Sequence, residues 1–295
     1  MYHVNEIEDE QLRKGFTFVL APGRDPLLAE MFLDTEDKVA ELSDMYRACF
    51  KANTFLGLKI SYINAVADMC DAAGGDISQI VEILGIDPRI GSGGMRPGIG
   101  YGGGCLPKDV RAFTASARQL GAEQAATLLR AAEKINESRT DVAMDLIRNA
   151  LGDRAVKNAK ITVWGAAFKP GTNDVRESPA LALAHALQQT GATVTVHDPQ
   201  AMATAMTRIP ELDYTDDLAA SVDGADLVVL ATEWPEYQQA DPKDLADRAA
   251  SPLLVDCRTT LDPEPLAHGR LDRSPARTTR EVEAAHARAA DLIGP

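Results

Sequence analysis

The chain has 295 residues, of which 45% are hydrophobic and 25% are charged, a globular composition with room for about two domains. Its 44 acidic residues outnumber the 30 basic ones, and the formal net charge is -14. This charge repels phosphate backbones, which argues against nucleic acid as a partner. It is compatible with a small nucleotide, because local donors and helix amino termini can hold one.

The sequence carries no signal for a membrane, a signal peptide or a metal site. No run approaches the roughly 18 apolar residues that cross a bilayer. The first residues are acidic, unlike the basic start of a signal peptide, so we expect a cytoplasmic protein. The four cysteines show no CxxC pair and no metal spacing with His, which excludes a zinc site or a disulfide framework of the usual kinds. They are Cys49, Cys70, Cys105 and Cys257.

The first half of the chain has a helical pattern. Residues 36–73 contain no Pro and one Gly, and their apolar residues recur at helical spacing on more than one face. Such a helix needs partners on several sides, which suggests a subunit interface. A short helix is predicted over 77–84. The glycine-rich segment 91–105 cannot form a stable helix or strand, and it indicates a backbone that turns sharply or approaches a ligand. The helical pattern resumes at Val110 and runs, with interruptions, to Leu151.

From Lys160 the pattern changes to short apolar or β-branched runs, most of them separated by alanine-rich helical stretches. This alternation predicts a parallel sheet wound by right-handed crossovers. The runs are 161–164, 193–196, 227–230 and 253–256. The turn 165–168 follows the first run as a dinucleotide-binding turn would, but it lacks the second and third glycines of GxGxxG. The last twenty-five residues are rich in Arg, Ala and Glu, a composition that predicts a terminal helix or a tail.

The strongest motif is Gly-Tyr-Gly-Gly-Gly-Cys-Leu-Pro-Lys-Asp over residues 100–109. Cys105 lies between a glycine loop and a new helix, whose amino terminus, together with Lys108, favours the thiolate. Asp109 follows four residues later and could act as a base towards a water. The alternative is a glycine turn that contains an incidental cysteine.

This loop resembles the catalytic loop of the UDP-glucose and GDP-mannose dehydrogenases, in which Gly-Gly-x-Cys-[Phe/Leu]-Pro-Lys-Asp supplies the nucleophile. Other segments resemble the same family, so that the resemblance runs from about residue 10 to residue 269. They are 10–18, 53–64, 87–91, 167–179, 232–235 and 256–258.

The resemblance implies an α/β chain in three parts. Residues 1–34 would be the remaining end of an NAD-binding domain. Residues 35–155 would form a helical central domain with the long dimerisation helix and the catalytic loop. Residues 156–295 would form a Rossmann-like UDP-sugar-binding domain with a parallel sheet.

The resemblance also implies a mechanism and a homodimer. The Cys105 thiolate would add to an aldehyde at the sugar C6 and form a thioester, with Asn53 holding the oxyanion and Asp109 activating the hydrolytic water. NAD would accept the hydrides. The implied substrate-binding residues are Lys169, Arg258, Arg89, Tyr101, Gly102 and Glu10, with Arg89 acting in the neighbouring subunit's sugar site. Arg176 would reach the NAD phosphates, and the alternative for Arg176 is a local salt bridge.

Two departures from the family pattern keep other functions open. Most of the NAD-binding domain is missing from this sequence, and Cys49 replaces the lysine four residues before Asn53. Losing such a charged donor typically costs about 10²–10³ in rate. The first hypothesis is a UDP-sugar dehydrogenase that receives its NAD domain from another chain or from outside this sequence. The alternatives are a non-redox enzyme on a nucleotide or nucleotide sugar that reuses Cys105 and Asp109, and a catalytically silent nucleotide-sugar-binding or oligomerisation subunit.

Overall fold

A computed structural model describes residues 36–261 and 272–273, and the side chains of residues 50–261. The chain divides into two compact units, residues 1–56 and 57–295, and helix α3 (Glu36–Ala73) contributes to both. Residues 1–34, with Glu10, and nearly all of the last twenty-five residues lie outside the described part. Cys49 lies in α3, but its side chain is not among those described. Within these ranges no helix is long and apolar enough to cross a bilayer.

The helical region follows the predicted order. The long helix spans Glu36–Ala73, as predicted, and the short helix α4 spans Ile77–Ile86. The interrupted pattern after the glycine loop becomes three helices: α5 (Leu106–Gln119), α6 (Glu123–Glu137) and α7 (Arg139–Leu151).

Helix α5 begins four residues before the predicted start at Val110. Pro107 lies in its first turn, where a missing backbone N–H breaks no hydrogen bond of the helix. Asp109 also lies in the first turn, where a negative charge is favourable. Pro107 and Asp109, which lie before the predicted start, are therefore part of the first turn of the helix.

The second half of the chain forms one parallel sheet in the order β3-β2-β1-β4-β5-β6. The four predicted strands are its central ones, so the predicted parallel sheet is confirmed. The two outer strands have only two residues each, too short to leave a recognisable pattern in the sequence. The strands are β1 (Lys160–Trp164), β2 (Thr193–His197), β3 (Asp213–Tyr214), β4 (Leu227–Leu230), β5 (Leu253–Asp256) and β6 (Asp272–Arg273).

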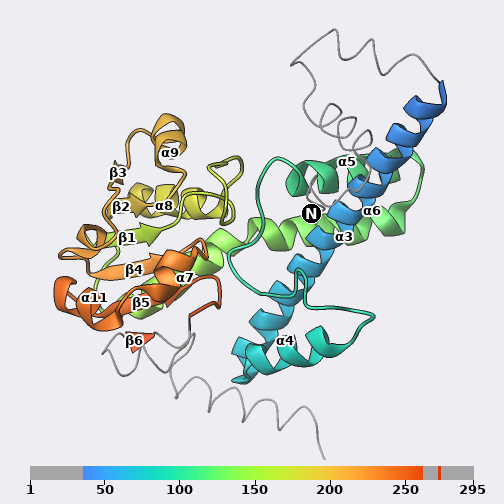
Figure 1. The fold of residues 1–295 in the computed structure, drawn as a ribbon. Helices are drawn as coiled ribbons and strands as arrows, with labels where there is room; N and C mark the ends of the chain where they lie inside the picture. Colours follow the sequence, from blue (N-terminus) through green and yellow to red (C-terminus); the bar gives the residue numbers. More distant parts are fainter. Residues whose placement is uncertain (1–35, 262–271, 274–295) are drawn as a thin grey trace, which may run out of the picture. The chain divides into compact units, whose positions relative to one another are not determined.

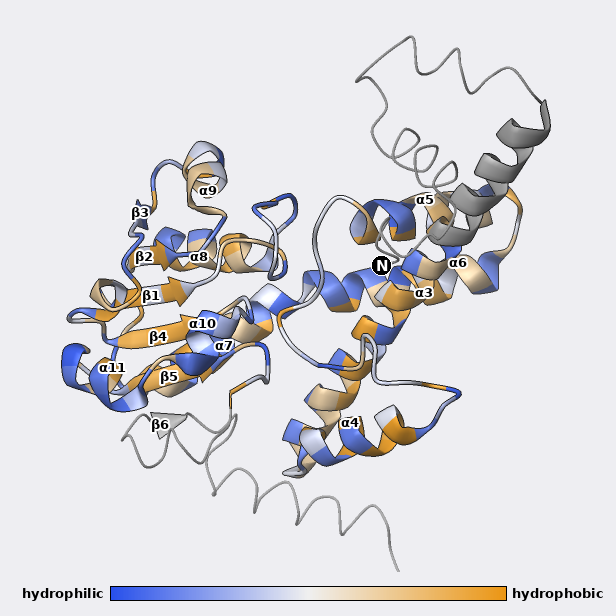
Figure 2. Ribbon diagram, in the orientation of Figure 1, coloured by the Kyte–Doolittle hydropathy of each residue, from blue (hydrophilic) through white to orange (hydrophobic). Residues whose placement is uncertain are grey.

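Helices lie alongside this sheet (Figure 1), and the central strands are apolar along most of their length (Figure 2). Trp164, Leu183 and Val229 have no exposed surface, which places the core between the sheet and its helices. The helices are α8 (Pro179–Gln189), α9 (Met202–Arg208), the 3-10 turn η2 (Ala220–Val222), α10 (Pro235–Gln239) and α11 (Pro242–Arg248).

The sheet topology indicates where a ligand would bind. The chain proceeds outward from β1 to β2 and β3, and then returns to the other side of β1 with β4. Open α/β sheets bind ligands at the carboxyl ends of the strands, where the strand order reverses. The turns that follow β1, β4 and β5 are therefore the expected positions of functional side chains.

We expect Leu183→Ala to lower the free energy of unfolding of the sheet domain by about 2–5 kcal/mol, because the fully buried side chain would leave a cavity. Leu128→Ala is the matched control, since Leu128 is exposed on α6, and it should change stability by less than about 0.5 kcal/mol. Urea unfolding followed by circular dichroism measures both. Equal effects of the two substitutions would contradict the assigned core.

Candidate functional site

The glycine loop, defined here as residues 100–104, lies against the segment that precedes α8. The backbone N–H of Gly103 donates to the carbonyl of Arg176 at 2.8 Å, and Gly103 has a φ of 82°. A Cβ on Gly102 would collide with the backbone carbonyl of Glu177. Only glycine fits this approach of two backbones. The glycines therefore serve a contact within the chain, besides any contact that they make with a ligand.

Cys105 and Asp109 lie at the amino terminus of α5, one turn apart and so on one face of the helix. Cys105 is the N-cap residue, its side chain caps no backbone group, and its carbonyl accepts from the N–H of Asp109 at 2.9 Å. Asp109 is only 4% exposed, and its Oδ1 accepts from Lys108 Nζ at 2.5 Å. The helix thus presents a partly exposed thiol beside a buried carboxylate that has a cationic partner.

The other two cysteines with described side chains are buried and lie elsewhere. Burial raises the pKa of Cys70, and the charges of Asp71 and Asp76 raise it further. Burial raises the pKa of Cys257 to about 12. Among these three cysteines, Cys105 alone is both partly exposed and at a helix amino terminus.

Arg176 lies next to Cys105. A Cβ on Gly104 would stand 2.6 Å from the Arg176 guanidinium, so this group covers the loop just before the cysteine. Arg176 Nη2 and Asp174 Oδ2 are 2.6 Å apart. The hydrogen bond with Asp174 raises the pKa of Arg176, and the charges of Asp174 and Cys105 act in the same direction. The local salt bridge is present, while the Arg176 side chain stays 71% exposed. Its contact with NAD remains a prediction.

Arg258 connects the glycine loop to two strand ends. It follows β5, and its Nε donates to the carbonyl of Ala231 at 2.7 Å, directly after β4. Its Nη1 donates to the carbonyl of Gly100 at 3.0 Å, and Glu233 Oε2 is 3.3 Å from Nε. Its Nη2 is buried and has no hydrogen-bond partner among the residues that the structure describes. Buried polar atoms normally have partners, so this nitrogen is suited to an anionic group of a ligand.

Lys169 lies in the turn after β1, next to a residue that contacts the same loop. The ring of the preceding residue, Phe168, lies against Gly103, since a Cβ there would stand 2.8 Å from a ring carbon. Lys169 Nζ is 5.6 Å from the centre of this ring, at the distance of a cation–π contact. Phe168, Arg258 and Cys105 are therefore brought to one glycine loop, although they lie far apart in the sequence, and Lys169 lies beside Phe168.

Tyr101 is held by a residue that the sequence analysis missed. Asn136 Oδ1 accepts from the N–H of Tyr101 at 2.8 Å, and Asn136 Nδ2 donates to its carbonyl at 3.1 Å. The Tyr101 ring packs near Gly57 on α3, and burial raises its pKa to about 12. Asn136 is one of several polar residues in a helical pattern, so nothing in the sequence distinguishes it from the others. Glu233 was also missed as a functional residue, although an acid beside Arg258 could have been suspected from their positions after neighbouring strands.

The remaining predicted residues lie on other segments, Arg89 after α4 and Asn53 on α3. Arg89 pairs with Asp87 at 2.5 Å and its side chain is 87% exposed. Lys59 on α3 donates to the carbonyl of Ile90 at 2.8 Å and so holds the Arg89 segment. Asn53 is half-buried in the first compact unit, and its role towards Cys105 remains a prediction. Among residues with described side chains, no cluster could hold a metal ion.

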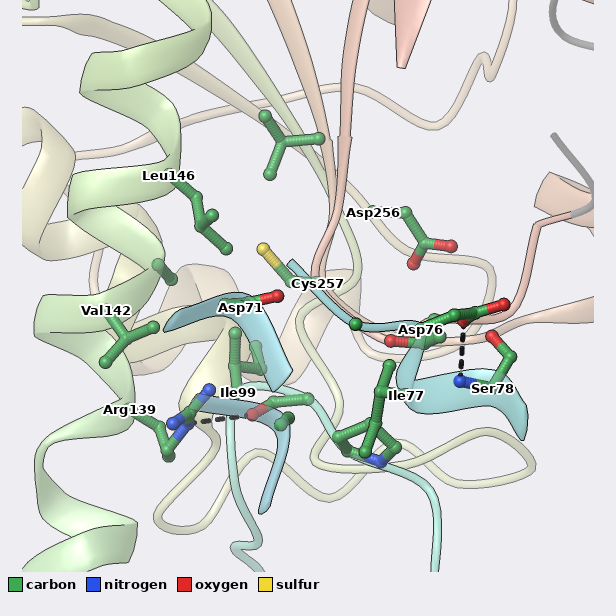
Figure 3. A pocket seen from close by; sticks show the side chains of 17 residues that line it. Asp71, Asp76, Ile77, Ser78, Ile99, Arg139, Val142, Leu146, Asp256 and Cys257 are labelled. Carbon is green, nitrogen blue, oxygen red and sulfur yellow. Dashed lines mark hydrogen bonds between the residues drawn. The ribbon is translucent and has the colours of Figure 1, made fainter. Parts of the chain in front are cut away.

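A cavity of about 460 Å³ is lined by Ile99, Cys257 and Thr259, next to the glycine loop and Arg258, but by none of the predicted site residues (Figure 3). Its acidic groups already support local structure: Asp76 accepts from the N–H of Ser78 at 2.8 Å, and Asp256 accepts from the N–H of Thr260 at 2.8 Å. Arg139 on its wall donates to the carbonyl of Gly98 at 3.1 Å. The glycine loop, and not this cavity, is therefore the candidate site.

Two family profiles match the chain. They are the central domain of the UDP-glucose/GDP-mannose dehydrogenase family, over residues 43–138, and the UDP binding domain of that family, over residues 162–263. Together they match more than half of the chain.

Individual proteins agree with this match. The chain is 39% identical over 224 residues to the UDP-glucose 6-dehydrogenase of Pseudomonas aeruginosa, covering 74% of this chain and 49% of that protein. It is 36% identical over 216 residues to UDP-glucose 6-dehydrogenase TuaD of Bacillus subtilis, covering 73% and 46%. The UDP-glucose dehydrogenase structure from Pyrobaculum islandicum matches with a TM-score of 0.69 and 30% identity, covering 83% of this chain and 57% of that one.

The chain spans about half the length of the curated relatives that it matches. The matched regions include the glycine loop, Cys105, Lys169 and Arg258, which the structure brings together. The chain belongs to the UDP-glucose/GDP-mannose dehydrogenase family.

Proposed function

We propose that this chain is the nucleotide-sugar-binding part of a UDP-sugar 6-dehydrogenase, with Cys105 as the nucleophile and the NAD-binding domain supplied in trans. One observation carries the proposal: Arg258, Cys105 and the turn that carries Lys169 meet around one glycine loop. Arg258 Nη1 donates to Gly100 at one end of the loop, and Cys105 follows its other end. A ligand held by the two cations would reach the thiol along the loop.

The two cations suit a pyrophosphate. They lie after β1 and β5, on either side of the point where the strand order reverses, and Arg258 Nη2 has no partner in the described part of the chain. Charge-assisted hydrogen bonds to phosphate oxygens are strong. The similar proteins from Pseudomonas aeruginosa and Bacillus subtilis are UDP-glucose 6-dehydrogenases, which supports a UDP-sugar as the ligand.

The chemistry assigned to the chain's own residues is covalent catalysis. The Cys105 thiolate attacks the aldehyde carbon at the sugar C6, a C–S bond forms, and the carbonyl electron pair moves to the oxygen. Asn53 is the residue proposed to donate to that oxygen. Asp109 is the proposed base towards the water that would hydrolyse a Cys105 thioester, whose formation needs the nicotinamide cofactor as oxidant, held outside the described residues. Lys108 donates to Asp109 and compensates the charge of this buried carboxylate.

The described residues do not fit NAD. The turn after β1 lacks the second and third glycines of a dinucleotide-binding turn. Its Ala166 and Ala167 N–H groups already donate to the Asp198 carboxylate, at 2.8 and 3.0 Å. A pyrophosphate would find no free donors there. We therefore derive no hydride-transfer step from this chain and propose a separate NAD-binding chain or domain, which the exposed Arg176 would meet beside Cys105.

A homodimer is part of the proposal. Large apolar side chains are exposed on α3 and α4, among them Met69 at 72% and Ile86 at 74%. Helix α4 is strongly apolar and has no buried residue. Apolar surface of this kind is typical of an interface. Arg89 follows α4 with an exposed side chain, and it would reach the sugar site of the partner subunit.

Uridine nucleotides should stabilise the purified chain, by about 2.7 kcal/mol at a hundredfold excess over the dissociation constant. Lys169→Met should weaken UDP binding about tenfold or more, because it removes a charge-assisted hydrogen bond. Lys160→Met at the opposite end of β1 is the control and should bind like the wild type. Isothermal titration calorimetry measures all three proteins. Tight binding of NAD without any response to uridine nucleotides would overturn the proposed ligand.

Cys105 should react with iodoacetamide faster than Cys70 and Cys257 near neutral pH, since burial raises the pKa of the other two thiols. UDP-glucose should slow the reaction by covering the sulfur. Peptide mapping by mass spectrometry measures the rates. Cys105→Ser should keep nearly wild-type UDP affinity, because a nucleophile adds little ground-state binding. A Cys105 that reacts more slowly than both buried cysteines would favour the catalytically silent subunit instead.

Light scattering at micromolar concentration should give at least twice the chain mass of 31.6 kDa. The double substitution Met69→Asp, Ile86→Asp should shift the protein to the monomer, because it would bury charges in the apolar interface. Leu120→Asp is the control, since Leu120 is 84% exposed at the end of α5, and it should leave the mass unchanged. A wild-type monomer would refute the homodimer.

A further inference from the structure

Asp198 occupies the place where sheets of this topology usually bind a phosphate. It follows β2 directly and is 2% exposed. Its Oδ2 accepts from the N–H groups of Ala166 and Ala167, which open the turn after β1. In dinucleotide-binding sheets, backbone N–H groups at this turn face the pyrophosphate. Here a side-chain carboxylate of the same chain takes the position of that anion.

The same carboxylate also binds two further turns. Its Oδ1 accepts from the N–H groups of Gln200 and Ala201, at 2.9 and 2.7 Å. Its Oδ2 also accepts from Trp234 Nε1 at 3.1 Å, in the turn after β4. A carboxylate has about four lone-pair sites, so five donors leave no capacity for a ribose hydroxyl. Asp198 thus links the carboxyl ends of β2, β1 and β4, which are neighbours in the sheet (Figure 1).

Both cations of the proposed nucleotide site depend on these turns. Lys169 lies two residues after Ala167, whose carbonyl also accepts from Thr232 Oγ1 at 2.8 Å. Glu233 precedes Trp234 and forms the ion pair with Arg258. A shift of the Asp198 carboxylate would therefore move the turn that carries Lys169 and the turn that supports Arg258.

We propose that Asp198 is the positioning residue of the nucleotide site, an inference that rests on the proposed function. Its carboxylate fills the anion position after β1, keeps nucleotide phosphates out of that turn, and directs them to Lys169 and Arg258. Five hydrogen bonds to an ionised acceptor are strong together. Their loss would leave two N–H groups of the turn unpaired in a buried place, so the turn would rearrange.

Asp198→Asn tests the first step, because the amide keeps the size of the side chain but loses the charge and one acceptor. We expect hydrogen exchange at the N–H groups of residues 166 and 167 to accelerate at least about tenfold, with a native circular dichroism spectrum. We also expect the dissociation constant of UDP to rise about tenfold or more, as when charge-assisted hydrogen bonds are lost. Asp226→Asn is the matched control at the opposite edge of the sheet, where Asp226 Oδ2 accepts from the N–H of Lys160 at 2.9 Å. It should change neither quantity.

Asp198→Ala with added formate tests whether the turn after β1 needs an anion at this place or only the covalently attached side chain. Formate can occupy the vacated place, so it should raise the melting temperature and lower the dissociation constant of UDP relative to chloride at equal ionic strength. The wild type should show no such difference. If Asp198→Asn does not fold, the yield of folded Asp198→Ala in formate against chloride gives the same test.

Wild-type exchange at residues 166 and 167, wild-type UDP affinity in Asp198→Asn, or no effect of formate would each overturn the proposal. A wild-type chain that binds no uridine nucleotide would instead overturn the proposed function. In that case the exchange rates still decide whether Asp198 holds the turn.

Discussion

The arrangement of the candidate site depends on the close approach of two backbones, the glycine loop and the segment before α8. The Gly103 N–H donates to the Arg176 carbonyl, and the missing side chain of Gly102 leaves room for Glu177. This contact joins the amino terminus of α5, with its thiol, to the end of the sheet that carries the cations. A side chain on the loop would separate the two. The glycines therefore allow the segments that carry Cys105 and Arg176 to lie side by side.

Anion binding in an acidic protein requires hydrogen-bond donors that the acceptors of the chain leave available. In Arg258, backbone carbonyls accept from Nε and Nη1 and Glu233 lies 3.3 Å from Nε, while Nη2 has no hydrogen-bond partner among the described residues. Asp198 shows the reverse, a carboxylate whose lone pairs are all taken by N–H donors. The net charge of -14 therefore says little about the ligand, because short-range donors decide what binds.

The same hydrogen bonds show why the turn after β1 of this Rossmann-like sheet does not fit a dinucleotide. A dinucleotide needs free N–H groups after β1 and a free acid after β2. Here the N–H groups of Ala166 and Ala167 donate to the carboxylate of Asp198, so neither the donors nor the acid are free for a dinucleotide. The fold alone would have suggested a cofactor site at this place. The hydrogen bonds of the turn therefore indicate which ligand fits there better than the strand order does.

The sequence by itself determined the class of fold, the long helix over 36–73, the four central strands and the motif around Cys105, because periodicity and glycine clusters are local signals. It did not show β3 and β6, which are too short to leave a periodic pattern. It also did not show that α5 starts at Leu106, because Pro107 usually interrupts a helical pattern. Only the tertiary structure decided that Arg258, Cys105 and the turn carrying Lys169 lie at one glycine loop. It also decided that Asn136 holds this loop, that Glu233 pairs with Arg258, and that Asp198 binds the turn after β1. Those contacts join residues far apart in the chain, so their geometry exists only once the chain has folded.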